Sequence, residues 1–194
     1  LTEHEHQHRH AVPEVVAELA RDEGADHGRR AQDAARMCAR KASGNEGEPA
    51  WTPDGRNVGF LATRNNRRTG WVRRADGSDT ARVAAPGSFK ADEIAFDPRG
   101  RHILFRSEGS GAGTRYLTKV GTGVDTVPER IVQSPFDHYA PTLSPNGDWI
   151  AYVSEESGAP EVYVRPFPNA DSARIAISVA GGQEPIWKRD GTEL

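Results

Sequence analysis

Residues 144–168 read SPNGDWIAYVSEESGAPEVYVRPFP, and residues 181–194 read GGQEPIWKRDGTEL. Both stretches contain a four-residue string that ends in glycine, and two more copies of this string lie earlier in the chain. The four copies are TPDG (52–55), DPRG (97–100), SPNG (144–147) and KRDG (188–191). Successive glycines are separated by 45, 47 and 44 residues. A period of this length predicts an internally repeated architecture rather than a single irregular domain.

The residues around each glycine keep the same register in every copy. A large apolar residue stands four positions before it, at Trp51, Phe96, Leu143 and Trp187. Apolar residues also follow three and five positions after it, for example at Ile103 and Phe105. Positions that differ by two lie on the same face of a β-strand. Each glycine string is therefore predicted to be a tight turn between two strands.

Each repeat is predicted to contain four antiparallel strands. The first ends at the apolar residue before the turn, and the second carries the alternating apolar pair. Polar loops are predicted next, at residues 62–70, 106–114 and 154–160, followed by a third strand and a fainter fourth strand. Four-stranded units with a period near 45 residues predict an all-β fold, a β-propeller. Since closed propellers have about 4–8 blades, this propeller is expected to be incomplete and part of a larger protein.

Composition divides the chain near residue 47. All fourteen aromatic residues lie at or after Trp51. Residues 1–47 are predicted to be a His-rich tail with two weak helices, helical or disordered, and they include Cys38, the only cysteine. The propeller is predicted to occupy residues 48–194. Its blades are expected at about 48–91, 92–138 and 139–183, with the start of a fourth at 184–194.

Charge and motifs exclude several classes of function. The net charge is −3, from 25 basic and 28 acidic residues, which gives no electrostatic signature of a nucleic-acid partner. No stretch approaches the roughly 20 apolar residues of a membrane span, and the first residues do not resemble a signal peptide. No nucleophile elbow and no kinase signature occur. We therefore predict no catalytic residue, no cofactor and no metal site.

The pattern of an aromatic residue, a proline-glycine turn and a short apolar strand resembles the WD-type repeat of TolB-like propellers. Residues 144–168 and 181–194 are also similar to the C-terminal propeller of bacterial serine/threonine protein kinases. The resemblance implies a non-catalytic module that binds a protein or peptide, as a scaffold or sensor, and a periplasmic or extracytoplasmic location. The alternative is the gating propeller of a prolyl-oligopeptidase-type serine peptidase whose hydrolase domain is separate. Self-association through unpaired blade edges is a further expectation.

The residues seven positions before each glycine are Glu48, Glu93, Ala140 and Glu184, and the three glutamates among them are candidate binding residues. Two interpretations remain open for the three glutamates. They could form a partial acidic ring in the central channel that binds a cation or a basic peptide, or they could cap strands and bond to the neighbouring blade. His138 lies near the same level and could join them. The alternating histidines at residues 4–10 are interpreted as a solvated tail.

Overall fold

The computed structural model describes residues 46–84, 90–108, 114–123 and 126–194. Within these residues the protein is all-β, with twelve strands in three four-stranded antiparallel sheets. Each sheet consists of four consecutive strands. The predicted fold class, an incomplete β-propeller, is thereby confirmed for this part of the chain. The predicted N-terminal helices and the histidine tract lie outside the described residues.

The sheets are called blades 1, 2 and 3 in chain order. Blade 1 contains β1 (Glu46–Trp51), β2 (Asn57–Arg64), β3 (Arg67–Arg74) and β4 (Arg82–Val83). Blade 2 contains β5 (Ala91–Phe96), β6 (His102–Glu108), β7 (Arg115–Gly121) and β8 (Glu129–Val132). Blade 3 contains β9 (His138–Leu143), β10 (Trp149–Ser154), β11 (Glu161–Pro166) and β12 (Ile175–Ala176). The predicted limits of the blades stay a prediction.

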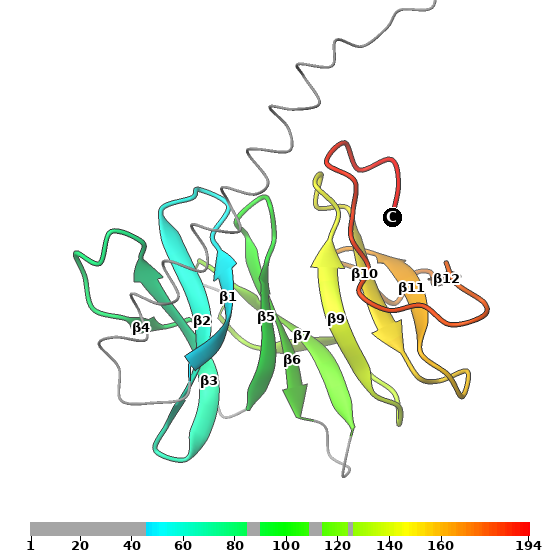
Figure 1. The fold of residues 1–194 in the computed structure, drawn as a ribbon, viewed down its shortest axis with the longest axis horizontal. Coiled ribbons are helices and arrows are strands. Elements are labelled where there is room, and N and C mark those ends of the chain that lie inside the picture. Colours follow the sequence, from blue (N-terminus) through cyan, green and yellow to red (C-terminus); the bar gives the residue numbers. More distant parts are fainter. Residues whose placement is uncertain (1–45, 85–89, 109–113, 124–125) are drawn as a thin grey trace, which may run out of the picture.

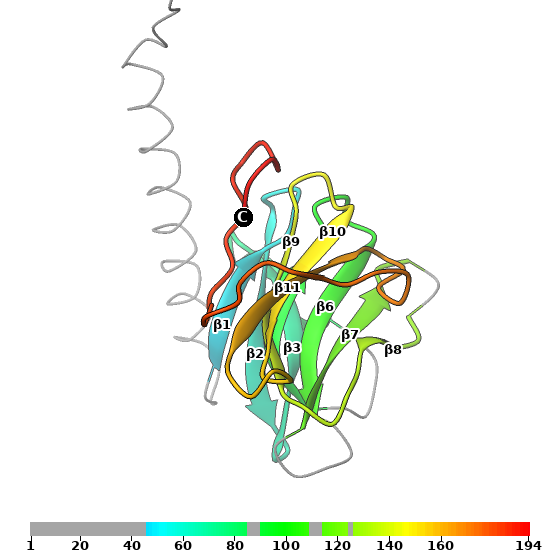
Figure 2. The ribbon, with the colours of Figure 1, turned by 90° about the vertical axis from the view of Figure 1, so that its right-hand side faces the viewer.

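The three blades are arranged like a fan. Their first strands, β1, β5 and β9, lie side by side across the front of the molecule (Figure 1), and β1 contacts β5 as β5 contacts β9. Seen from the side, β1 lies at one edge of the molecule and β8 at the opposite edge (Figure 2). The first strands are therefore the inner strands of the propeller, and the short fourth strands are the outer ones.

The turn after each inner strand has the predicted glycine geometry. The four turn glycines all have positive φ, between 64° and 74°, which glycine adopts without steric cost. In each turn the glycine N–H donates to the carbonyl three residues earlier, at 2.7–2.9 Å. The fourth copy, around Gly191, makes the same bond to Lys188, although no strand is present at residues 184–194. The turn is therefore encoded locally and forms without a complete blade around it.

The predicted polar loop at residues 62–70 is wrong in its length. Strand β2 continues to Arg64 and β3 begins at Arg67, and these two residues pair directly. Only Asn65 and Asn66 form the turn, with φ of 51° and 60°. Asparagine tolerates this left-handed conformation better than most residues, and two such residues make a tight hairpin turn whose twist matches the strands. The run of polar residues therefore predicted a loop that is longer than the turn in the structure.

Blades 1 and 2 approach closely because two glycines of blade 1 lie under aromatic rings of blade 2. A Cβ on Gly70 would lie 2.5 Å from Cε1 of Phe105, and a Cβ on Gly59 would overlap the ring of Phe96. Side chains at either position would push the sheets apart. Buried apolar residues of both blades complete this interface, at Leu61, Ala91, Ile94, Ile103, Phe105 and Val120.

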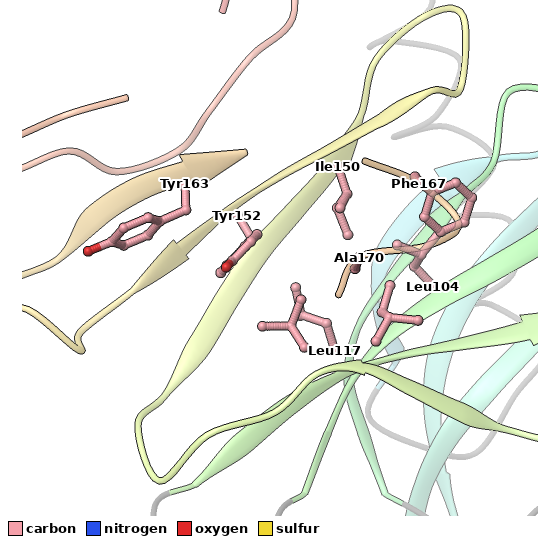
Figure 3. Packing of buried hydrophobic residues seen from close by; sticks show 9 residues of the cluster. Leu104, Leu117, Ile150, Tyr152, Tyr163, Phe167 and Ala170 are labelled. Carbon is pink, nitrogen blue, oxygen red and sulfur yellow. The ribbon is translucent and has the colours of Figure 1, made fainter. Parts of the chain in front are cut away.

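Blades 2 and 3 are held together by a larger apolar cluster (Figure 3). Leu104 and Leu117 come from blade 2, and Ile150 and Tyr152 come from β10 of blade 3. Phe167 follows β11 and packs into the same cluster. The apolar residues of β10 that follow the turn at the predicted spacing thus face the preceding blade, which explains why the repeat preserves them.

Candidate functional site

The inner strands present the candidate site at one of their two ends. In each blade the inner strand is the first strand of the sheet and pairs with only one neighbour in that sheet. Its other edge lies on the inner side of the fan, where β1, β5 and β9 meet (Figure 1). We call the end of β1, β5 and β9 that carries Glu48, Glu93 and Ala140 the glutamate end, and we assign Glu184, the equivalent residue of the fourth repeat, to it by its repeat position. The opposite end, which leads into the glycine turns, is the turn end.

An irregular backbone marks the glutamate end in every blade. The register of strand pairing shifts in each inner strand. The shift lies between Gly47 and Ala50 in β1, between Ala91 and Glu93 in β5, and in the part of β9 that pairs with β10. Glu48, Ala140 and Glu184 have φ of 54°, 51° and 53°. Residues other than glycine rarely adopt this conformation, and bulges of this kind redirect a side chain out of the regular ladder. The repeated position is therefore a bulge in the three inner strands, and Glu184 has the same left-handed conformation outside any strand. The side chains of Glu48 and Glu184 are exposed.

Glu93 connects two blades. Its Oε2 accepts a hydrogen bond of 2.7 Å from the backbone N–H of Ala140 in β9, and its Oε1 accepts one of 3.3 Å from Nη1 of Arg106. Burial raises the pKa of Glu93, while the charge of Arg106 and the bond from Ala140 lower it. This carboxylate is half-buried and bonded to the neighbouring blade.

Arginine–carboxylate pairs surround the glutamate end. Arg106 also donates from Nη2 to Oδ2 of Asp137 at 2.6 Å, which ties blade 2 to the segment that enters blade 3. Asp92 accepts from Nε of Arg115 at 2.6 Å and lies 3.7 Å from Nη1 of Arg68 in blade 1. Sequence reasoning missed these pairs because the repeat does not preserve them: Leu61 and Val153 occupy the position of Arg106 in the other blades.

His138 lies in the wall of the glutamate end rather than on its surface. His138 is only 1% exposed. The imidazole Nε2 lies 2.8 Å from Oγ of Ser134, and the ring packs edge-on against Tyr152 at 5.7 Å. Burial lowers the pKa of His138 to about 4. The ring is therefore neutral at neutral pH. A ligand bound at the glutamate end would contact the residues that cover His138 before it reached the ring.

The turn end is apolar. A cavity of about 500 Å³ is lined there by Trp51, Phe96 and Leu143, the residues four positions before the turn glycines. The turn prolines Pro53, Pro98 and Pro145 complete its wall. The fourth repeat continues this arrangement, because Nε1 of Trp187 donates to the carbonyl of Thr142 in β9 at 3.4 Å. The sequence identified these residues as anchors of the repeat, but not that they enclose a cavity.

The described residues contain no group of three His, Cys, Asp or Glu side chains placed to hold a metal ion. The same part of the chain contains no helix that is long and apolar enough to cross a bilayer.

Comparisons with known proteins agree with this architecture. No protein-family model matches the chain. The uncharacterized protein Atu1656 of Agrobacterium fabrum is 26% identical over 159 residues, which cover 74% of this chain and 52% of that protein. The chain thus spans about half the length of this curated relative.

Solved structures show the same fold at lower sequence identity. TolB from Acinetobacter baumannii superposes with a TM-score of 0.64 at 21% identity, over 76% of this chain and 36% of that one. A TolB candidate from Agrobacterium tumefaciens gives 0.61 at 24% identity, over 74% and 54%. A prolyl endopeptidase gives 0.51 at 12% identity, over 69% and 22%. The three sheets of this chain therefore form part of a β-propeller of the kind found in TolB proteins.

Proposed function

We propose that the chain is a non-catalytic propeller module that binds a protein or peptide partner at its glutamate end, as a scaffold or sensor part of a larger protein. One observation carries the proposal: the left-handed backbone shared by Glu48, Ala140 and Glu184, which lies in a bulge of the inner strand at Glu48 and at Ala140. A left-handed backbone at a residue other than glycine costs free energy, and such conformations cluster at functional positions. The cost is repeated in three repeats at the same position, so a common role is inferred.

The chemistry of the glutamate end favours a basic partner. Glu48 and Glu184 are exposed, whereas the acids Asp92 and Asp137 are already paired with arginines. Each exposed carboxylate attracts lysine or arginine side chains, and the attraction falls as salt screens it. Glu93 would keep the two blades in place around the ligand, and His138 would support the wall behind it.

The sensor role follows from the resemblance to propellers of bacterial protein kinases, and we keep it as part of the proposal. The rival proposal is the gating propeller of a prolyl-oligopeptidase-type peptidase. Its support is the likeness to a prolyl endopeptidase, which concerns the fold alone. Gating does not need a glutamate at the repeated position. Loss of peptide binding after replacement of Glu48 and Glu184 would therefore favour the binding module over the gating propeller.

Self-association through the last blade is a second part of the proposal. Beyond β12 the chain exposes Ile177, Val179 and Ile186, the last two by 90% and 78%. Apolar side chains that protrude beside an outer strand favour contact with another sheet. A second copy of this chain would supply such a sheet.

The peptide-binding proposal is tested with a random peptide library screened against the purified chain. We expect selected peptides to be basic and to bind more weakly at high salt. The variant with Glu48→Gln and Glu184→Gln should lose them, whereas Glu129→Gln, on the outer strand β8, should keep them. Selection of peptides without basic residues, or equal loss in both variants, would contradict the proposal.

A further inference from the structure

A second recess lies between blades 1 and 2, away from the glutamate end. Its volume is about 610 Å³, which falls in the range of roughly 300–1,000 Å³ typical of ligand sites. Blade 1 contributes Val72, Val83 and Ala84 to its walls, and blade 2 contributes Phe96, Ile103 and Gly121. Polar groups at its margin include the side chains of Asp54, Arg82 and Arg99. We call this recess the inter-blade cleft.

Between blades 2 and 3 the chain itself fills the corresponding place. The segment after β11 places Phe167 and Ala170 in the cluster that joins these blades (Figure 3). The Phe167 ring packs edge-on against His102 of blade 2 at 5.3 Å. Nζ of Lys119 donates to the carbonyl of Pro168 at 3.3 Å. An aromatic residue followed by a short bonded turn is therefore a segment that fits between two blades of this protein.

At the described positions of blade 2 that correspond to this segment, the side chains are smaller. The residues from 20 to 23 positions after the turn glycine are Phe167, Pro168, Asn169 and Ala170 in blade 3, and Val120, Gly121, Thr122 and Gly123 in blade 2. Valine replaces phenylalanine, and two glycines replace larger residues. The opposite wall is also smaller, because Val72 takes the place of Leu117. The cleft thus follows from the loss of side-chain volume at repeated positions.

The charges at the margin of the cleft select the ligand further. Asp54 accepts bonds from Oγ1 of Thr52 at 2.5 Å and from the backbone N–H of Arg56 at 3.0 Å. Arg99 is paired with Asp148 at 2.5 Å. Arg82 has a side chain that is 63% exposed and lies 3.8 Å from Asp79, a distance at which pairing is weak. The guanidinium of Arg82 is therefore the group best placed to receive an acid.

We propose that the inter-blade cleft docks a partner peptide in which an aromatic residue precedes an acidic residue by a few positions. The protein's own segment PFPNAD (166–171) has this chemistry, with Phe167 followed by Asp171. The aromatic ring would occupy the apolar part between Val72 and Ile103, and the acid would reach Arg82. This proposal rests on the proposed peptide-binding function but assigns it a second surface with the opposite charge preference.

The test uses a fluorescently labelled synthetic peptide with the sequence PFPNAD, titrated into the full chain and followed by fluorescence anisotropy. We expect saturable binding that Val83→Asp weakens about tenfold, because an apolar contact is lost and a like charge is added. Arg82→Glu should weaken binding similarly. Val83 is 49% exposed, so its replacement should leave the fold intact, which circular dichroism would check.

The matched control is Ile175→Asp in β12, the outer strand of blade 3. Ile175 is 47% exposed, so this variant places the same charge on a similar strand away from the cleft. It should bind the peptide as the unaltered chain does. Absence of saturable binding, or equal affinity of Val83→Asp and Ile175→Asp, would overturn the proposal.

The two peptide surfaces can fail separately. Changing Glu48 and Glu184 should not alter binding of PFPNAD, and changing Val83 should not alter binding of basic peptides. If PFPNAD binds as expected but basic peptides do not, the proposed function of the glutamate end is refuted and the proposal for the cleft is not. If basic peptides bind as expected but PFPNAD does not, only the proposal for the cleft is refuted.

Discussion

The carboxylate of Glu93 in β5 accepts a 2.7 Å hydrogen bond from the backbone N–H of Ala140 in β9. A side chain of one blade thus satisfies the irregular backbone of the next, at the position that the repeat marks in both. The same carboxylate is bonded by Arg106. The bulge at Ala140 is therefore supported from outside its own sheet.

This relationship predicts the effect of removing Glu93. Glu93→Ala leaves the Ala140 N–H without its partner and removes one of the two carboxylates bonded to Arg106. We expect a loss of about 1–3 kcal/mol in the free energy of unfolding. Glu129→Ala removes an exposed acid from the outer strand β8 and should cost less than about 1 kcal/mol. Urea denaturation of both variants is the measurement. Equal losses would show that the bond across the blades contributes nothing.

The close packing of blades 1 and 2 predicts a strong effect of one added methyl group. Gly70→Ala would place Cβ 2.5 Å from the ring of Phe105, and overpacking of this kind typically costs about 1–3 kcal/mol. Gly123→Ala is the control, because a Cβ there meets nothing within 4 Å. Thermal unfolding should separate the two variants clearly. Stabilities that agree would mean that the blades do not approach at Gly70 as described.

The buried His138 predicts a dependence of stability on pH. Burial lowers the pKa of this imidazole from 6.5 to about 4. Between these values the unfolded chain binds a proton that the folded chain does not, so stability falls as pH decreases from 6.5 toward 4. The shift corresponds to at most about 3 kcal/mol. His138→Gln removes this titration, so the difference in free energy of unfolding between the variant and the unaltered chain should change between pH 6.5 and pH 4. A constant difference would contradict the prediction.

The sequence predicted those features of the fold that depend on residues near one another in the chain. Proline and glycine in the turn at 144–147 act locally, and the apolar residues of β10 follow from strand alternation. For the same reason the turn around Gly191 forms without a complete blade. The short hairpin at Asn65 and Asn66 was missed, because a polar run can be either a long loop or a two-residue turn.

The candidate site was predictable only in part. The equivalence of Glu48 in β1 and Ala140 in β9 followed from the repeat, since a residue at a fixed distance from each turn recurs at the same position of its strand. The pairing of Arg106 with Asp137 could not be predicted, because Asp137 lies in the segment between blades 2 and 3 and neither residue has a counterpart in the other repeats. The burial of His138 likewise depends on Tyr152, which a neighbouring strand supplies.

The exposed residues beyond β12 predict self-association. Ile177→Lys combined with Val179→Lys replaces two exposed apolar side chains with like charges, which repel a second copy. Sedimentation velocity should show a concentration-dependent increase in size for the unaltered chain and a smaller increase for this variant. Val127→Lys, at another exposed apolar residue, should behave like the unaltered chain. Association that persists equally in both variants would place the contact elsewhere.

Photo-crosslinking tests most directly whether the glutamate end is the binding surface. A photoreactive amino acid in place of Pro49, the exposed neighbour of Glu48, is irradiated with a labelled basic peptide selected from the library. We predict a crosslinked product at this position and none with the same amino acid in place of Gln133, which follows the outer strand β8. Crosslinking at Gln133 with none at Pro49 would contradict binding at the glutamate end.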